Sequence, residues 1–310
     1  MNSSQKHVLL AGGTGLVGSR LTQLLIERDY HIHILSRKAH QSSNAKISYH
    51  QWDLTKNYID PKSLEVDAIV NLAGAGIADK RWTPARKKEI IESRTMSTAL
   101  IHKGISEHQH KPTHYIGSSA IGIYGSSPQI MLTEDQESTE DDFMVDVCRQ
   151  WEEAHHQVAS DIKDVSILRI GIVLSTKGGA LKEILKPLEM GRIGAYFGDG
   201  QMIYSWIHID DLCQMIIDLI DNKLEADTYN AVAPNPTSNK TLVETIETAS
   251  KKKALTVPAP SFVMKLVFGE MSKTILNSTS VSSSKIENAG FGFQFPELHE
   301  ALAHLLSKRI

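Results

Sequence analysis

Short apolar runs alternate with amphipathic stretches through the first half of the chain. The runs have the length and composition of strands buried on both faces, and they cover residues 8–11, 31–35, 68–72, 114–117 and 165–173. Apolar positions at helical spacing fill three of the intervals, at residues 19–28, 87–103 and 143–159. This alternation predicts βαβ units and an α/β fold with a Rossmann-type, doubly wound parallel sheet.

The pattern changes after residue 173, where glycines interrupt the chain. It returns at residues 206–221 as strand, turn and helix, and a last helix is expected at residues 298–306. Between them, residues 278–284 are rich in Ser and Thr, which predicts a mobile loop.

Two structural units follow from this change of pattern. Residues 1–173 and 206–232 are expected to form the Rossmann domain. Residues 174–205 and 233–310 are expected to form a smaller C-terminal α/β lobe. A chain of 310 residues is long enough for this division.

Composition narrows the class of protein. A formal net charge of −3 argues against nucleic-acid and membrane-surface partners, which both call for a basic face. Cys148 and Cys213 lie in helix-like apolar patterns, so both are expected to be buried, reduced thiols. No apolar run reaches membrane-spanning length and no signal-peptide core follows the N-terminus, which predicts a cytoplasmic protein. A homodimer is among the assemblies we consider.

Paired histidines do not predict a metal site. His31 and His33 fall on a strand, and His108 and His110 fall in a polar loop. His155 and the residue after it are adjacent on a helix and point in different directions. None of these pairs has a third ligand at a suitable spacing, so we expect no bound metal.

A glycine-rich turn follows the first predicted strand and opens a helix. Glycines at positions 12, 15 and 18 have the G-x-x-G-x-x-G spacing. The first permits the tight turn, the second admits a pyrophosphate to the backbone, and the third lets the helix pack on the sheet. Helix N–H groups would then face the phosphates. The alternative is a glycine turn without a ligand. We expect a dinucleotide to contact Gly12, Gly13, Thr14, Gly15, Leu16 and Val17.

Residues after the second predicted strand favour NADP(H) over NAD(H). An NAD-specific site places an Asp or Glu there, and that carboxylate would repel a 2′-phosphate. This chain has Ser36, Arg37 and Lys38 instead, and a hydroxyl with two cations suits a phosphate. An ordinary solvated basic loop is the alternative. Asp53 is placed where a carboxylate could meet the adenine amino group.

Several motifs together resemble the extended short-chain dehydrogenases/reductases. They are the glycine loop, Asn71-Leu72-Ala73-Gly74, Ser118-Ser119 with Tyr124-Gly125, and Trp206-Ile207-His208-Ile209-Asp210-Asp211-Leu212. Other stretches are similar to the atypical branch called "epimerase family protein", or sugar-nucleotide epimerase-like. These are Arg81-Trp82-Thr83, Ser93-Arg94, Trp151-Glu152, and residues 168–174, 178–180 and 290–293. The resemblance covers nearly the whole chain.

This resemblance implies a Rossmann domain with a small C-terminal lobe that closes over the substrate. It also implies NADP(H) contacts beyond the glycine loop, at Ser36, Arg37, Leu72, Ala73, Gly74, Glu89, Arg94 and Val173. Arg94 lies on the predicted helix after residues 68–72, so its cation could reach the cofactor phosphates or ribose. The alternative for Arg94 is a surface salt bridge with Glu89 or Glu92.

The chain departs from the superfamily at the residues that transfer protons. The usual chemistry needs a Ser or Thr and a Tyr-x-x-x-Lys motif, whose Lys lowers the pKa of the Tyr. Alignment on Tyr124 puts Ala120 at the usual Ser position. Met144 and Cys148 have the spacing of the Tyr and Lys, and neither can transfer the proton. The standard mechanism is therefore not supported.

Three other groups are candidates for proton transfer. Tyr124 lies near the strand end that faces the nicotinamide, although packing beside neighbouring glycines would also explain it. Ser119 is adjacent to the usual Ser position. His208 has a suitable pKa, with a structural histidine as the alternative. Arg81 and Trp82 suit an anionic or ring-bearing substrate, unless they anchor their loop.

Two functions remain open at this point. The first is an NADP(H)-dependent oxidoreductase or epimerase-like enzyme that acts on a small polar substrate with an altered proton-transfer arrangement. The second is an NADP(H)-binding redox sensor or regulatory protein without turnover, which the missing Ser, Tyr and Lys would suit.

Overall fold

A largely parallel sheet forms the centre of the molecule. The computed structural model describes residues 5–38, 40–136, 138, 140–251, 254–259, 266 and 269–307. The strands of this sheet are β1 (His7–Ala11), β2 (His31–Ser36), β3 (Ile47–Asp53), β4 (Tyr58–Ile59), β5 (Ala68–Asn71), β6 (His114–Ala120), β8 (Asp164–Ile170) and β13 (Thr228–Ala231). Their order is β13-β8-β6-β5-β1-β2-β3-β4, and β4 pairs antiparallel with β3.

The order of the strands reverses between β1 and β5, because β1 is hydrogen-bonded to β2 on one side and to β5 on the other. Loops at the carboxyl ends of these strands diverge at such a point and leave room for a dinucleotide. The predicted Rossmann-type sheet is therefore confirmed, with the reversal at the strand that precedes the glycine loop.

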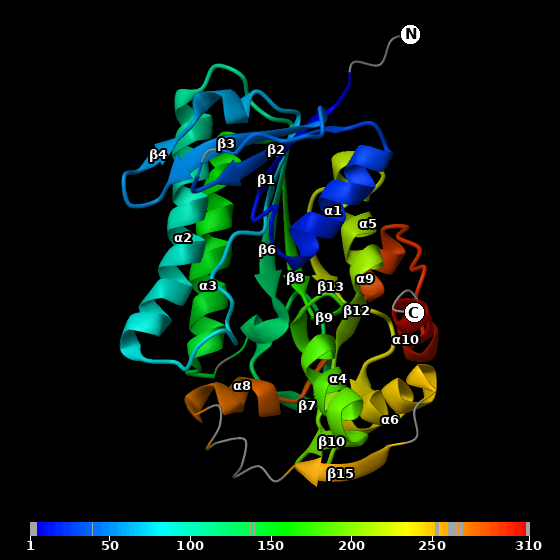
Figure 1. Cartoon of the computed structure of the whole chain (residues 1–310). Helices are drawn as coiled ribbons and strands as arrows, with labels where there is room; N and C mark the ends of the chain where they lie inside the picture. Colours follow the sequence, from blue (N-terminus) through cyan, green and yellow to red (C-terminus); the bar gives the residue numbers. More distant parts are fainter. Residues whose placement is uncertain are drawn as a thin grey trace.

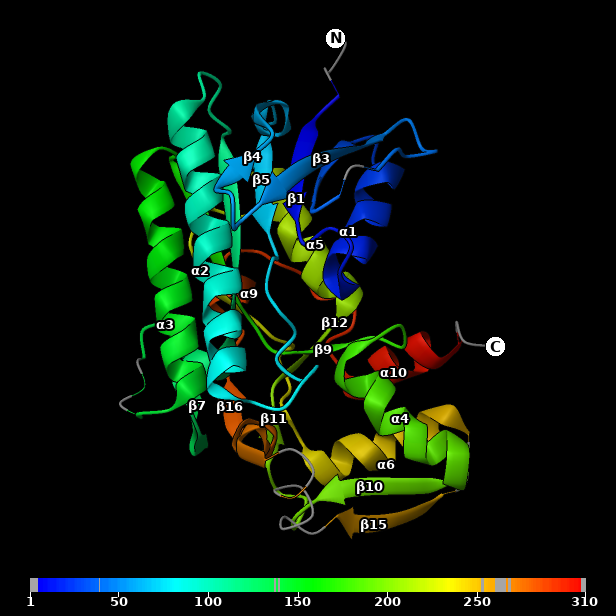
Figure 2. The same cartoon turned by 60° about the vertical axis from the view of Figure 1, so that its left-hand side comes forward.

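Helices cover both faces of the sheet. Helices α1 (Leu16–Glu27) and α5 (Ile209–Ile220) pack on one face, and α2 (Pro84–Glu107) and α3 (Phe143–His156) lie on the other (Figure 1). Figure 2 shows the strands between these two layers. Alternate residues of β1 explain the double covering, because Leu10 enters the core with α1 while Leu9 enters the core with α2.

Smaller elements after β6 build the second part of the molecule, at the bottom of the view in Figure 1. A four-stranded sheet has the order β14-β11-β16-β7, and two strand pairs, β12-β9 and β10-β15, accompany it. Its strands are β7 (Ser127–Leu132), β11 (Ile203–Tyr204), β14 (Thr237–Ser238) and β16 (Thr279–Val281). The two pairs are β9 (Ile172–Leu174) with β12 (Trp206–His208), and β10 (Ile193–Phe197) with β15 (Leu255–Ala259).

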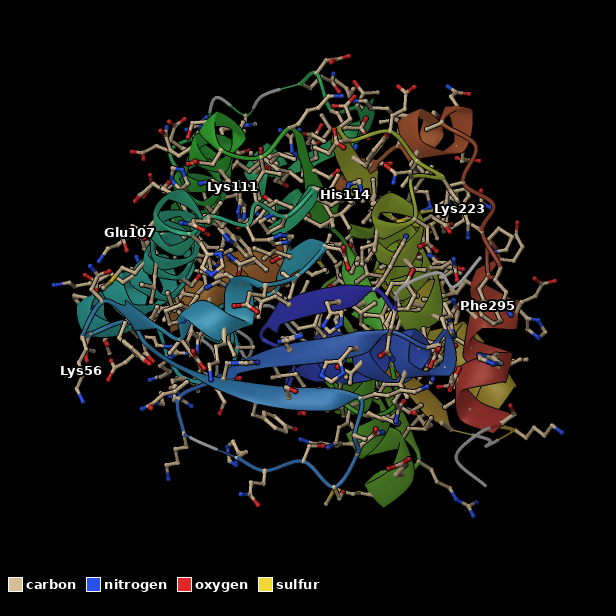
Figure 3. All side chains as sticks on the ribbon, turned by 90° about the horizontal axis from the view of Figure 1, so that it is seen from above. Lys56, Glu107, Lys111, His114, Lys223 and Phe295 are labelled. Carbon is tan, nitrogen blue, oxygen red and sulfur yellow. The ribbon has the colours of Figure 1, made fainter. Side chains whose placement is uncertain are left out.

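The remaining helices pack around these strands. They are α4 (Gly179–Gly191), α6 (Asn239–Ser250), α8 (Ser272–Leu276), α9 (Ser284–Asn288) and α10 (Leu298–Ser307), with 3-10 turns η1 (Pro61–Leu64), η2 (Ile121–Tyr124), η3 (Gln157–Ser160) and η4 (Gly269–Met271). Seen from above, Phe295 lies at one side of the molecule, while Lys56 and Glu107 lie at the opposite side (Figure 3). Phe295 is buried in the core that includes α5, so the C-terminal segment belongs to that flank.

One expected strand differs in the structure, and one strand of the central sheet was not expected. The run at residues 165–173 forms two strands, β8 and β9, which break at Gly171. A Cβ at Gly171 would lie 2.6 Å from the carbonyl oxygen of Ser205, so the break lets β12 approach closely. Strand β3 was not predicted, because its residues are mostly polar and only half buried.

The mobile loop expected at residues 278–284 is wrong. Residues Thr279–Val281 form β16, which pairs with β11 and β7. The hydroxyl of Thr279 donates to Gly125 O at 2.8 Å, and Ser205 Oγ accepts from Val281 N at 2.9 Å. Composition alone predicts a loop from Ser and Thr residues, because it does not show that their hydroxyl groups bond to buried backbone groups.

Both cysteines are free and buried, as expected. Among the described residues, no helix combines the length and apolar character that crossing a membrane requires.

Candidate functional site

The glycine loop is packed too tightly for any side chain at two of its positions. Gly12 has a φ of 81°, and a Cβ there would lie 2.7 Å from the carbonyl oxygen of Leu72. A Cβ at Gly18 would lie 2.3 Å from the carbonyl oxygen of Gly12. The loop therefore presses against both α1 and the segment after β5. Among the described residues no side chain caps α1 at Gly15, so its first N–H groups are open to water or to a ligand.

The end of β2 lies next to this loop, because Ala11 and Leu35 are register partners. Ser36 is half buried, and Arg37 and Lys38 are exposed and form no ion pair with a described residue. Asp53 caps its own turn by accepting from Thr55, whose hydroxyl bond lowers the pKa of this half-buried carboxylate. A contact between Asp53 and adenine stays a prediction.

Residues after β5 continue the site. Leu72 donates its N–H to Ala11 O at 2.9 Å, and Ala73 donates to the side chain of Asn71 at 3.1 Å. Asn71 is fully buried, where its amide donates to Thr98 and Tyr115. The segment is thus fixed beside the glycine loop, as the predicted contacts at Leu72 and Ala73 require.

Arg94 lies under this segment as a buried cation. Its side chain is 6% exposed, and a Cβ at Gly74 would lie 3.1 Å from its guanidinium carbon. The guanidinium donates to Ile90 O and Ala75 O at 2.8 and 3.2 Å and lies 4.7 Å from the Trp151 ring. Its Nε has no hydrogen-bond partner. Burial lowers the pKa of Arg94, and no carboxylate of a described residue pairs with it.

The surface salt bridge considered for Arg94 is wrong. Glu89 pairs with Arg86 at 2.7 Å, and Glu92 pairs with Lys88 at 3.6 Å. Arg94 is on the face of α2 that carries Ile90 and Ile101, and this face turns inward. Glu89 is on the exposed face, so the structure does not bring it together with Arg94.

The predicted substrate contacts anchor their loop in this structure. Trp82 donates its indole N–H to Ile77 O at 3.0 Å and meets the Phe143 ring edge-on at 4.8 Å. Arg81 is exposed and donates to Leu266 O. Val173 is half buried in β9. Contacts of these residues with a ligand stay predictions.

Two sulfur-containing side chains stand at the positions that the sequence predicts for the usual Tyr and Lys. Met144 and Cys148 are buried on α3, and a Cβ at Gly122 would lie 3.5 Å from Cys148 Sγ and 3.6 Å from Met144 Cβ. Burial raises the pKa of the Cys148 thiol to about 12, so it stays protonated and is a poor nucleophile. Ala120 ends β6 at the usual Ser position.

Tyr124 and Ser119 belong to a buried polar network around an ion pair. Arg169 binds Glu152 through Nε and a terminal nitrogen, both at 2.9 Å. Ser119 donates to Glu152 at 2.6 Å. Tyr124 accepts from Arg169 at 2.9 Å and donates to Asn230 at 2.6 Å. Burial is the largest cause that raises the pKa of Tyr124. Both hydroxyls therefore already have partners in this network.

Sequence reasoning missed the residues that hold this network together. Glu152, Arg169 and Asn230 come from α3, β8 and β13, so their meeting depends on the tertiary fold. One local signal was available, because Arg169 stands between apolar residues, Leu168 and Ile170, in a largely buried strand. A charge in such a run needs a buried partner.

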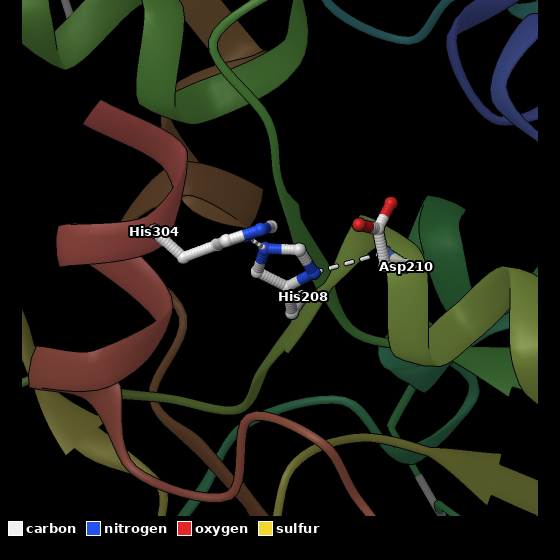
Figure 4. A group of neighbouring side chains, drawn as sticks. All are labelled: His208, Asp210 and His304. Carbon is white, nitrogen blue, oxygen red and sulfur yellow. Dashed lines mark hydrogen bonds between the residues drawn. The ribbon is translucent and has the colours of Figure 1, made fainter. Parts of the chain in front are cut away.

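His208 is completely buried at the junction of β12 and α5. Its Nδ1 accepts from the backbone N–H of Asp210 at 2.9 Å, and its Nε2 lies 3.0 Å from His304 Nδ1 (Figure 4). The Phe295 ring stacks on it at 4.0 Å. The hydrogen bonds of His208 lead to Asp210 and His304, whereas those of Tyr124 lead to Arg169 and Asn230.

The cluster of His208, Asp210 and His304 offers three possible metal ligands within 4.8 Å of one another. However, Asp210 already binds Arg20 through both oxygens, at 2.6 and 3.0 Å. Nδ1 of His208 accepts an N–H, so its Nε2 carries the ring proton and has no lone pair for a metal. The arrangement fits a hydrogen-bonded chain better than a metal centre.

The family profiles and the most similar curated sequences point to the same protein family. The profile of the NAD dependent epimerase/dehydratase family matches residues 8–232, and a profile for a domain of unknown function, DUF1731, matches residues 259–305. An "Epimerase family protein" of Staphylococcus aureus is 37% identical over 303 residues, which cover 98% of this chain and 100% of that protein. One from Staphylococcus haemolyticus is 36% identical over 301 residues, covering 97% and 99%.

Solved structures with the same fold include a human relative that was determined with NADPH, the epimerase family protein SDR39U1 (isoform 2). It is 29% identical, with a TM-score of 0.85, and the match covers 97% of this chain and 99% of that one. A nucleoside-diphosphate sugar epimerase from Corynebacterium glutamicum is also 29% identical, with a TM-score of 0.75, and the match covers 98% of this chain and 59% of that one.

Proposed function

The chain belongs to the NAD dependent epimerase/dehydratase family, and we propose that the dinucleotide it uses is NADP(H). Ser36 and Arg37 support this choice, because a hydroxyl and a guanidinium stand where an NAD-specific site has a carboxylate. The human relative solved with NADPH is in agreement.

Ser36 and Arg37 carry the choice of NADP(H), and Arg94 is the observation that supports a dinucleotide site as such. A buried cation without a carboxylate is costly, and an anionic or strongly polar ligand would offset that cost. Only glycine at position 74 leaves the guanidinium open to such a ligand, because a Cβ there would lie 3.1 Å from it. We infer that the glycine loop, residues 72–74 and Arg94 would contact the cofactor together, because a Cβ at Gly12 would meet Leu72 and a Cβ at Gly74 would meet Arg94.

The substrate is proposed to be a small polar molecule held between two parts of the chain. These are the Rossmann domain, residues 1–173 and 206–232, and a capping lobe, residues 174–205 and 233–310. Arg81 is exposed on the loop between β5 and α2, where its charge would attract an anionic group. With Ala120 at the usual Ser position, proton transfer would fall to Tyr124, Ser119 or His208, or to the substrate and water.

Titration of the purified protein with NADPH and NADH tests the cofactor. We expect NADPH to bind tighter by about tenfold or more, because one charge-assisted phosphate contact contributes on that scale. Arg94→Met should weaken the binding of both cofactors. Ser36→Asp should weaken NADPH and spare NADH, which makes NADH the internal control. Equal affinities for the two cofactors in the unmodified protein would remove the basis of the proposal.

A second candidate function is cofactor binding without turnover, as a redox sensor or regulatory protein. The buried Met144 and Cys148 favour it, together with the engaged hydroxyls of Ser119 and Tyr124. A sensor must bind the reduced and oxidised cofactors with different affinities. Equal binding of NADPH and NADP⁺ would rule out the sensor, and consumption of NADPH with a metabolite library would establish the enzyme.

A further inference from the structure

The motif at residues 206–212 connects the cofactor helix to the C-terminal helix. Asp210, in the first turn of α5, accepts from Arg20 of α1 at 2.6 and 3.0 Å. This two-point contact fixes both the distance and the angle between the side chains. Because the N-terminus of α1 follows the glycine loop, the position of Asp210 bears directly on the proposed pyrophosphate site.

His208 holds the first turn of α5 in place. It is the N-cap residue, and its Nδ1 accepts from Asp210 N at 2.9 Å. A neutral imidazole that accepts at Nδ1 carries its proton on Nε2. That proton points to His304 Nδ1, 3.0 Å away on α10 (Figure 4). The acceptor on α10 therefore selects the tautomer that can cap α5.

The C-terminal segment also contacts the same turn at a second place. Asp211, 1% exposed, accepts from Gln294 N and Phe295 N at 2.9 and 3.0 Å. The Phe295 ring lies 4.4 Å from that of His304. Consequently the C-terminal segment is held against α5 by two contacts, one before α10 and one through His304 on α10, and the second leads to Arg20.

We propose that His304 is a positioning residue for the cofactor site. By accepting the Nε2 proton of His208 it fixes the capping tautomer, which holds the first turn of α5 and keeps Asp210 against Arg20 of α1. This inference rests on the proposed binding of NADPH. A hollow of about 420 Å³ is lined by Thr14, Asp210 and His304 among others, so direct contact between His304 and a ligand is the rival explanation.

Three substitutions at position 304 separate these explanations. Asn places an oxygen near the position of Nδ1, so His304→Asn should still accept from His208 and keep NADPH affinity within about twofold. His304→Leu has nearly the same shape as Asn without an acceptor, and should weaken NADPH binding about fivefold, at the low end of known couplings between sites. Gln places its polar end near Nε2, so His304→Gln should behave like Leu.

The same measurements need two controls. His299→Leu changes an exposed histidine on the same helix and should leave NADPH affinity unchanged. Thermal melting without cofactor should show each variant folded at the titration temperature. Nitrogen-15 spectra of labelled histidines should assign the Nε2–H tautomer to His208 in the unmodified protein and in His304→Asn, and a mixture of tautomers in His304→Leu.

The outcomes are distinct from those for the proposed function. If the unmodified protein binds no NADPH, the proposed function fails before position 304 is tested. If it binds and His304→Leu binds equally well, the positioning role is overturned while the cofactor assignment stands. Rescue by Gln rather than Asn, or by neither, also overturns it, because the accepting Nδ1 would then not be the group that matters.

Discussion

Two buried arginines lie against aromatic rings in this protein, and their partners differ. Arg94 lies 4.7 Å from the Trp151 ring, and Arg169 lies 5.2 Å from the Tyr124 ring. Arg169 is paired with Glu152 through two hydrogen bonds, whereas Arg94 has backbone acceptors and an Nε without a partner. Burial lowers the pKa of Arg94. It would also lower that of Arg169, but the bonds to Glu152 outweigh burial and raise it.

The difference supports two roles: Arg169 holds elements of the fold together, and Arg94 is the arginine that we propose meets a ligand. The hydrogen bonds of Arg169 all join elements of the protein, so its guanidinium is satisfied within the described residues. At Arg94 the protein bears the cost of burying a charge and does not recover it within the described residues. Burial alone would not distinguish the two sites, and the accounting of hydrogen-bond partners does.

Matched Arg→Met substitutions give the largest expected effect. Arg169→Met leaves Glu152 buried and unpaired, so the free energy of unfolding should fall by about 3–5 kcal/mol. Arg94→Met removes an unpaired cation of similar burial, and stability should change by less than about 1 kcal/mol in either direction. Urea denaturation without cofactor measures both. The double variant Arg169→Met, Glu152→Leu should recover part of the loss. Equal losses at the two arginines would contradict the comparison.

Acid should destabilise the protein because it must protonate buried histidines that the fold holds neutral. His155 is fully buried on α3, where Tyr115 and Ser118 O bind its two nitrogens at 2.8 and 3.0 Å. Burial lowers its pKa from 6.5 to about 4, and lowers that of His33 to about 3. Between these values and 6.5 the unfolded chain binds protons that the folded chain does not. Stability is therefore full above pH 6.5 and falls as the pH drops toward 4.

Each of these histidines should contribute a slope of up to about 1.4 kcal/mol per pH unit in that window. Denaturation curves at pH 7, 6, 5 and 4.5 measure the total slope. In His155→Gln the protein should start from a lower stability and lose up to about 1.4 kcal/mol per pH unit of this slope, because His31, His33 and His114 also have lowered pKa values and remain. A free energy of unfolding that stays flat from pH 7 to 5 would mean that the two imidazoles are not held neutral.

The part of the molecule that is local in sequence was predictable. The glycine loop combines a strand, three spaced glycines and a helix within residues 7–27, so its geometry follows from the chain itself. The buried parallel strands were predictable because both of their faces are apolar. The placement of Leu72 beside Gly12 follows from the strand order once a Rossmann sheet is assumed.

The polar interior could not be read from local patterns. Tyr124 and Asn230 are 106 residues apart, and nothing near either residue indicates the other. Glu89 and Glu92 lie five and two residues before Arg94, and neither spacing is the three or four that brings side chains together on one helix face. Only the orientation of α2 against the sheet decided that Arg94 turns inward. The Ser and Thr residues of β16 were predicted as a loop because their sequence is polar, and only the tertiary fold shows that they are hydrogen-bonded in the interior.

Gly74 offers the finest test of the contrast, because it changes Arg94 without removing it. A Cβ at this position would lie 3.1 Å from the guanidinium carbon and 3.2 Å from a terminal nitrogen, so Gly74→Ala must push the cation aside by a few tenths of an ångström. NADPH affinity should fall about fivefold, which corresponds to about 1 kcal/mol. Stability should stay within about 0.5 kcal/mol, because the guanidinium has no carboxylate to lose.

A glycine with open space around it is the matched control for this change. A Cβ at Gly292 would meet nothing within 4 Å, so Gly292→Ala should leave NADPH binding unaltered. The decisive comparison is the double-mutant cycle with Arg94→Met. If Gly74→Ala acts through the guanidinium, it should have no further effect on affinity once that group is gone. An undiminished fivefold loss in the Arg94→Met background would mean that Gly74→Ala acts through the loop backbone. The guanidinium of Arg94 would then not be the group through which position 74 affects NADPH binding.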